Sequence, residues 1–150
     1  MTDLITVDLV DLDLVGADRH EATRSLAARL VRAGRVTDLD GFLADVRARE
    51  EQMPTGLEGG IGIPHARSSY VTEPTLAFGR SAAGIDFGAA DGPAKLIFLI
   101  AAPDGGGSEH MKILAALARR LVHPSFRDAL SAASDREAVV NLIKTEVFER

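Results

Sequence analysis

Hydrophobic and polar positions change their period several times along the chain, and these changes mark alternating strands and helices. Residues 4–15 (LITVDLVDLDLV) alternate apolar and acidic side chains, which is typical of a strand with one buried face. We predict one or two short strands here, with Ile5, Val7 and Leu9 on a shared face.

Two helices are predicted next, each preceded by a capping residue. Asp18 and Glu21 have the spacing of a capping box, in which side chains accept hydrogen bonds from free N–H groups of the first turn. Gly34 ends this helix, and Asp38 precedes the second one. The apolar positions that recur at helical spacing are Leu26, Leu30 and Val31 in the first helix, and Leu39, Phe42, Leu43 and Val46 in the second.

The middle of the chain is predicted to be rich in strands. Short candidates are residues 61–63, 75–79 and 84–87, with the turn-like SAAG (81–84) between the last two. Residues 95–102 (KLIFLIAA) do not alternate, which indicates a strand buried on both faces.

Three helices are predicted in the C-terminal third. The longest covers residues 109–122 and follows the loop PDGGGS (103–108). The predicted starting positions are Ser108 as the cap of this helix, Pro124 for a short helix that reaches Leu130, and Ser134 with Glu137 as a capping box for the last helix.

These elements mix without strict βαβ alternation, and no repeat, low-complexity tract or linker divides them. The length of 150 residues suits one domain. We therefore expect a single α/β domain with a mixed β-sheet of about five strands and helices on both faces.

The composition excludes several classes of function. A net charge of −5 without a basic cluster argues against a nucleic-acid surface. The chain has no cysteine, which excludes disulfides, thiol nucleophiles and thiolate metal sites. The longest apolar run, residues 96–102, is far shorter than a membrane span, and the N-terminus lacks the features of a secretory signal. We expect a cytoplasmic protein without direct membrane insertion.

The candidate chemistry centres on His65, which lies in a loop rich in glycine and proline within REEQMPTGLEGGIGIPHAR (49–67). Such residues let the backbone approach a charged group closely. A neutral imidazole keeps a free lone pair near pH 7, so His65 can attack phosphorus. The alternative is a turn histidine without a chemical role.

Three further residues could complete a phosphohistidine site. His110 lies at the start of the helix at 109–122, where free N–H groups favour an anion; alternatively, it is a buried histidine bonded to a carbonyl. Arg49 continues the apolar stripe of the second helix. Its guanidinium would either donate hydrogen bonds to phosphate oxygens or offset the partial negative charge at the helix C-terminus. Glu50 would pair with Arg49 or be solvated.

No other pattern competes with this one. His20 is expected at the surface, and His123 is expected at a helix start. No histidine or carboxylate spacing predicts a metal site, PDGGGS is not a phosphate-binding P-loop, and no G-x-S-x-G motif is present. We expect neither a metal nor another cofactor.

Residues 49–67 resemble the phosphorylation-site signature of the enzyme IIA domains of the fructose/mannitol class of the bacterial phosphotransferase system, and PTGLEGGIGIPHAR is the most specific part. The resemblance continues through FGRSAAGIDFGAADG (78–92) and KLIFLIAAPDGGGSEHMKILAALARRL (95–121) into the last helix. It implies that residues 1–150 form one enzyme IIA phosphocarrier domain, most like the fructose branch.

The resemblance also implies a phosphoryl relay. The carrier protein HPr, charged from phosphoenolpyruvate by enzyme I, would phosphorylate Nε2 of His65, with His110 as a second active-site histidine and Arg49 as the arginine of the site. The phosphoryl group would pass to a cysteine of a IIB domain, and then to sugar (expected to be fructose) entering through the membrane permease IIC. Because the chain lacks cysteine, these partners are expected in trans. Arg67 matches a variable position without an assigned role.

Docking and regulation complete the expectations. Ile61 and Ile63 would contribute to a shallow apolar surface around His65 that binds HPr and IIB in turn. The alternative function is a regulatory protein of the nitrogen-related enzyme IIA type, whose phosphorylation state controls binding to other proteins. A metal-dependent phosphatase-like enzyme would need ligands that the sequence lacks.

Overall fold

The computed structural model describes residues 4–105 and 109–148, without the side chains of Glu109 and His110. In this part of the chain, strands form one six-stranded mixed sheet in the order β1-β5-β6-β3-β2, with β4 also paired to β6. The strands are β1 (Val10–Asp11), β2 (Gly56–Leu57), β3 (Ile61–Gly62), β4 (His65–Ser68), β5 (Thr75–Ile85) and β6 (Ala94–Pro103). The α/β class is confirmed, with six strands where about five were expected.

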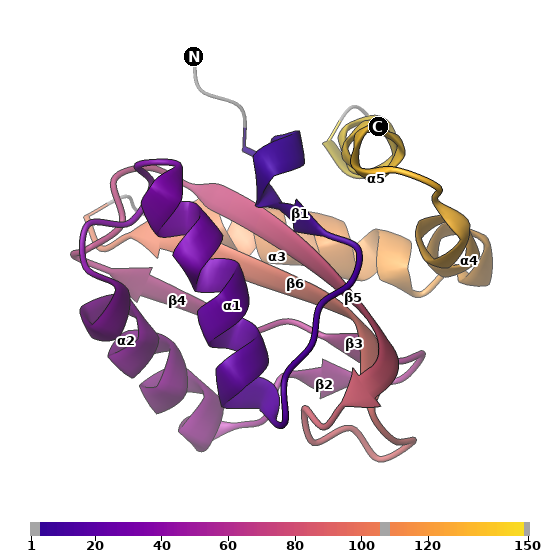
Figure 1. Cartoon of the computed structure of the whole chain (residues 1–150), viewed down its shortest axis with the longest axis horizontal. Coiled ribbons are helices and arrows are strands. Elements are labelled where there is room, and N and C mark those ends of the chain that lie inside the picture. The colour runs from indigo at the N-terminus through magenta and orange to yellow at the C-terminus, as the bar shows by residue number, and fades with distance from the viewer. Residues whose placement is uncertain (1–3, 106–108, 149–150) are drawn as a thin grey trace.

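Helices cover both faces of the sheet, as predicted. α1 (Arg19–Arg32) and α2 (Leu39–Gln52) lie side by side on one face, and α3 (Glu109–Leu121) crosses the other (Figure 1). α4 (Pro124–Ala132) and α5 (Arg136–Ile143) continue from α3 toward the edge of the sheet that carries β1. Each of these helices corresponds to a segment that the hydrophobic pattern predicted.

β6 is the central strand, and its apolar run is buried on both faces as its lack of alternation indicated. β5 pairs with it in antiparallel fashion on one side, where the rings of Phe78 and Phe98 lie 5.1 Å apart between centroids. On the other side, β3 and then β4 pair with it in parallel fashion. The chain between them, Ile63 and Pro64, interrupts what would otherwise be a single strand, and this interruption positions His65.

The predicted helix caps on the first face are present. Oδ1 of Asp18 accepts a hydrogen bond from the backbone N–H of Glu21 at 2.9 Å. Oε2 of Glu21 accepts one from Ala17 at 2.7 Å, one residue earlier than the usual partner in a capping box. At the start of α2, Oδ1 of Asp38 accepts a hydrogen bond from the N–H of Gly41 at 3.3 Å. These caps fix where the two helices begin.

The N-terminal segment contains one short strand, within the one or two predicted, but a turn that its alternating pattern did not predict precedes the strand. Val7–Leu9 form a 3-10 turn, and Val10–Asp11 form the short strand β1, which pairs with β5. Leu9 and Val10 are adjacent in the sequence and both are fully buried. Consecutive buried side chains do not follow the alternation of one buried and one exposed face that the sequence pattern indicated.

The predicted turn SAAG is a bulge inside one long strand. β5 runs through it, and its pairing with β6 shifts register between Arg80 and Ile85. Gly84 has a φ of +84°, a conformation that other residues rarely adopt. The glycine therefore marks a real local irregularity, but the irregularity kinks the strand instead of reversing the chain.

Two capping predictions near the C-terminus have different outcomes. Ser108 lies outside the described residues. The last helix is capped by Asp135 and not by Ser134, because Oδ1 of Asp135 accepts a hydrogen bond from the N–H of Ala138 at 2.8 Å. Either residue has a partner at the right spacing, and the carboxylate is the stronger acceptor. A π-helical turn, Lys144–Phe148, follows α5.

Candidate functional site

His65 is the first residue of β4 and pairs with Ile100 of the central strand. It therefore lies on a strand, and not in the loop that the sequence predicted. Pro64 has no N–H to donate, but its carbonyl oxygen accepts a hydrogen bond from the N–H of Ile100 at 3.1 Å. The rigid centre of the sheet thus fixes the backbone of His65, whose side chain is half-buried.

The imidazole ring of His65 is oriented by its own neighbourhood in the chain. Nδ1 lies 2.8 Å from the carbonyl oxygen of Ile63. A carbonyl oxygen can only accept, so Nδ1 is the nitrogen that carries the proton. The neutral ring then has its lone pair on Nε2. This arrangement prepares Nε2 to act as a nucleophile.

Burial lowers the pKa of His65 below its ordinary value of 6.5, and the charge of Arg49 lowers it further. The hydrogen bond to the Ile63 carbonyl and the charge of Glu50 oppose this shift without cancelling it. The ring is consequently neutral at pH 7, which is the protonation state that a nucleophile requires.

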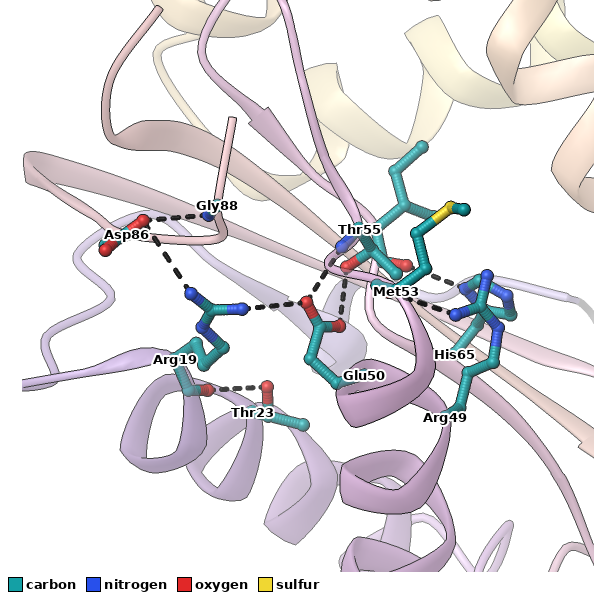
Figure 2. Close-up of polar contacts among 10 residues, drawn as sticks. Arg19, Thr23, Arg49, Glu50, Met53, Thr55, His65, Asp86 and Gly88 are labelled. Carbon is teal, nitrogen blue, oxygen red and sulfur yellow. Dashed lines mark hydrogen bonds and ion pairs between the residues drawn. The ribbon is translucent and has the colours of Figure 1, made fainter. Parts of the chain in front are cut away.

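Arg49 lies beside His65 at the end of α2 (Figure 2). Its Nη1 donates a hydrogen bond to the carbonyl oxygen of Met53 at 3.0 Å, so the guanidinium offsets the negative end of the helix. Among the described residues this is the one hydrogen bond found for Arg49, and a guanidinium has further N–H groups to give. The two interpretations of Arg49 are therefore compatible, since the same group can cap the helix and meet an anion at His65.

A short hairpin that the sequence did not predict precedes His65. β2 pairs in antiparallel fashion with β3, with Gly56 opposite Gly62. The turn between them contains Gly59 and Gly60, with φ values of +99° and +76°. The signal was present in the sequence as EGG, because glycine favours tight turns. The two-residue strand β2 was too short for its apolar pattern to be detected.

Glu50 is neither solvated nor paired with Arg49, which corrects both expectations. It is 6% exposed, and its Oε1 accepts a hydrogen bond from Oγ of Thr55 at 2.7 Å. Its Oε2 accepts one from the N–H of Thr55 at 2.8 Å and one from Nη1 of Arg19 at 3.2 Å (Figure 2). Glu50 thus links α1, α2 and the segment that enters the hairpin.

Arg19 and Thr55 are the two participants that sequence reasoning missed. The helical stripe placed Glu50 on an inward face, and a buried carboxylate needs a cation or several hydrogen-bond donors. A partner was therefore implied, but Arg19 is 31 positions away. Nothing in the spacing of one helix reveals which residue of another helix will meet it.

His110 lies in the first turn of α3, and its side chain is outside the described residues. Its predicted role beside His65 is untested by this structure. The backbone places the start of α3 after the C-terminal end of β6, the strand whose Ile100 pairs with His65.

The remaining candidates lie where they were expected. His20 is exposed on α1, and His123 is the exposed residue before α4. Nη2 of Arg67 donates to the carbonyl oxygen of Asp104 at 2.7 Å, which ties β4 to the end of β6. Arg67 therefore has a structural contact, and no chemical role is assigned to it.

A groove of about 460 Å³ lies near the site but does not contain its nucleophile. It runs along α1 and α2, and its lining includes Arg19, Glu50 and Pro64 but neither His65 nor Arg49. Within the described residues, no group of three or more histidines, cysteines or acidic residues could hold a metal ion. No helix in the same part of the chain is long and apolar enough to cross a membrane.

Ile61 and Ile63, which were predicted to contribute to an apolar surface around His65, are not exposed. Ile61 and Ile63 are 1% and 3% exposed and belong to the core. Met53 and Leu57, by contrast, are 64% and 42% exposed. Met53 lies next to Arg49 at the end of α2, and Leu57 is in β2. The two isoleucines belong to the buried core, so they offer no apolar surface to a partner.

Comparison with known proteins gives consistent results. Residues 3–146 match the family described as phosphoenolpyruvate-dependent sugar phosphotransferase system, EIIA 2. The chain is 48% identical over 120 residues to the fructose-specific EIIA component of the phosphotransferase system of Haloferax volcanii, which covers 79% of this chain and 77% of that protein. It is 37% identical over 115 residues to the fructose-specific EIIABC component of Bacillus subtilis, which covers 76% of this chain but only 18% of the relative.

The fold is also similar to solved structures. The nitrogen regulatory protein IIA-Ntr from Neisseria meningitidis superposes with a TM-score of 0.86 at 28% identity, covering 93% of this chain and 96% of that one. The sequence relatives therefore carry fructose-specific names, whereas this structural neighbour has a regulatory name.

Proposed function

The chain belongs to the EIIA 2 family of the phosphoenolpyruvate-dependent sugar phosphotransferase system, whose members transfer phosphoryl groups, and from this premise we propose that residues 1–150 act as one phosphocarrier domain. The domain accepts a phosphoryl group from phospho-HPr on Nε2 of His65 and passes it to a cysteine of a IIB partner. The supporting observation is the 2.8 Å contact between Nδ1 of His65 and the Ile63 carbonyl, because it leaves the lone pair on Nε2.

In the first step, the lone pair of Nε2 forms a bond to phosphorus while the bond from phosphorus to the donor histidine nitrogen breaks. The electron pair of that bond returns to the donor nitrogen. The proton stays on Nδ1 of His65, where the carbonyl of Ile63 continues to accept its hydrogen bond. This contact stabilises the positive charge that develops on the ring.

In the second step, a cysteine thiolate of the IIB partner attacks phosphorus and the bond to Nε2 breaks. The electron pair returns to Nε2, which restores the neutral form of His65 without any net proton transfer. Arg49 lies beside the ring (Figure 2) and donates to the phosphoryl oxygens in both steps. His110 is proposed as a second active-site histidine that mainly assists onward transfer, so His110→Ala should slow that step more than phosphorylation.

The partners follow from this relay. HPr and IIB bind in turn over the exposed side chains of Met53 and Leu57, which suit the small interfaces of transient complexes. IIB passes the phosphoryl group to sugar that enters through a membrane IIC permease. The fructose-specific names of the two sequence relatives support fructose as that sugar. We place the domain in the cytoplasm, with no metal or other cofactor in either step.

Intact-mass analysis after mixing the chain with phosphoenolpyruvate, enzyme I and HPr tests the proposal. We expect the mass of a single acid-labile phosphoryl group on the wild type and on His20→Ala, which removes an exposed histidine of α1. We expect no added mass on His65→Ala. Adding a metal chelator should leave the result unchanged. An unchanged mass gain in His65→Ala would overturn the assignment of the nucleophile.

A regulatory role is the second candidate, and the similarity to IIA-Ntr of Neisseria meningitidis favours it. In that case phosphorylated chain would bind a regulated protein and would not discharge to a cysteine. Incubating the phosphorylated chain with a fructose-class IIB domain separates the two. Loss of the phosphoryl mass from this chain and its gain on IIB supports transport, whereas a stable phosphorylated chain supports regulation.

A further inference from the structure

A buried carboxylate lies behind the phosphoryl site without touching its histidine. Glu50 is 6% exposed and accepts hydrogen bonds from Thr55, through both its Oγ and its N–H, and from Nη1 of Arg19 (Figure 2). Such a group is costly to bury unless it is fully paired. The three contacts meet this requirement and hold Thr55 at a fixed position relative to α1 and α2.

Thr55 in turn holds the segment that orients the histidine. Its carbonyl oxygen accepts a hydrogen bond from the N–H of Ile63 at 3.2 Å. The carbonyl of the same Ile63 accepts the hydrogen bond from Nδ1 of His65 at 2.8 Å. Pro64 lies between them and is anchored to β6 through Ile100. The Ile63 carbonyl is therefore fixed from the hairpin on one side and from the central strand on the other.

We propose that Arg19, Glu50 and Thr55 are positioning residues that hold His65 in the tautomer with its proton on Nδ1 by fixing the carbonyl of Ile63. The tautomer of a histidine is set by the partner of its other nitrogen. If the hairpin moves, Nδ1 loses this acceptor, and the ring can place its proton on Nε2 instead. A ring in that form has no lone pair on the exposed nitrogen. The kinetic part of the proposal rests on the proposed function, and the tautomer part does not.

The tautomer can be measured directly, with no phosphoryl donor, from the nitrogen chemical shifts of the ring in ¹⁵N-histidine-labelled protein. We expect His65 to carry its proton on Nδ1 in the wild type and to become a mixture in Thr55→Val, which keeps the branched shape but loses the hydroxyl. Thr55→Ser keeps the hydroxyl and should restore the wild-type pattern. Phosphorylation by HPr should slow roughly threefold to tenfold in Thr55→Val, the factor that corresponds to about one hydrogen bond.

Thr75→Val is the matched control, because Thr75 is also buried and its hydroxyl is also hydrogen-bonded to a charged side chain, accepting from Nη1 of Arg35 at 3.1 Å. It should lose comparable stability while the tautomer of His65 stays unchanged. Arg19→Gln is a second test, at a partner of Glu50 whose side chain is 23% exposed, and it should shift the tautomer in the same direction as Thr55→Val. A wild-type tautomer in both Thr55→Val and Arg19→Gln would overturn the proposal. If the wild type takes no phosphoryl group from HPr, the proposed function fails, and the tautomer result still decides the positioning role.

Discussion

Oγ of Ser68 donates a hydrogen bond to Oδ2 of Asp45 at 2.6 Å. This contact joins β4, the strand that carries His65, to α2, the helix that carries Arg49. Ser68 is 2% exposed, so the bond is largely shielded from water. Ser68 and Asp45 take no part in the proposed chemistry. Their hydrogen bond holds the strand of the nucleophile and the helix of the cation in a fixed position relative to each other.

Ser68→Ala should destabilise the domain by about 1–2 kcal/mol, the effect of losing a shielded hydrogen bond to a carboxylate. Urea unfolding followed by circular dichroism measures this change. The adjacent Ser69 is exposed, and Ser69→Ala should change the free energy of unfolding by less than about 0.5 kcal/mol. Equal stability of the two variants would show that the contact with Asp45 does not support the site.

The sequence predicted those features of the fold that depend on local pattern. Asp18 and Asp38 were recognisable as caps because a helix start needs an acceptor for its free N–H groups, and the structure contains both bonds. Residues 95–102 were recognisable as a strand buried on both faces because the apolar run 96–102 does not alternate with polar positions. In each case, the information lies within a few residues of the element that it specifies.

Features that depend on distant partners could not be predicted in the same way. The pairing of Glu50 with Arg19 joins residues on two helices, and only the packing of α1 against α2 brings them together. The segment SAAG (81–84) was similarly ambiguous, since glycine suits both a turn and a bulge. Whether the chain reverses at Gly84 depends on the pairing with β6, which no local pattern encodes.

Arg49→Ala should slow phosphorylation of His65 roughly tenfold to a hundredfold, the equivalent of about 1.5–3 kcal/mol for hydrogen bonds to a charged group. Arg49→Lys should recover part of the rate, because lysine keeps the charge but loses the fork of donors. Quenched-flow mass analysis with phospho-HPr measures these rates. Arg47→Ala removes a neighbouring exposed arginine of α2 and should leave the rate unchanged. A loss of rate in Arg47→Ala as large as in Arg49→Ala would indicate general attraction of HPr and not a contact with the phosphoryl group.

Gly56→Ala tests the hairpin that supports the Ile63 carbonyl. An added Cβ would lie 2.7 Å from the carbonyl oxygen of Phe87 and from the N–H nitrogen of Ala89. Because both are backbone atoms, β2 and the loop that follows β5 must move apart, and we expect a loss of about 1–3 kcal/mol in stability. Gly105 has no neighbouring atom within 4 Å of the same position, so Gly105→Ala should be close to neutral. Thermal unfolding followed by calorimetry compares the two, and equal melting temperatures would show that the hairpin has more room than the structure indicates.

The lowered pKa of His65 predicts how the stability of the domain changes with pH. Because burial and Arg49 lower this pKa below 6.5, the folded state binds fewer protons than the unfolded state near that pH. The contribution of His65 to stability is therefore fully present above pH 6.5 and is lost as the pH falls through the folded pKa. Between pH 7 and pH 5 the wild type should lose more stability than His65→Gln, which has no proton to bind. Urea unfolding at both pH values measures the difference. An equal loss in the two proteins would mean that burial does not hold the ring neutral.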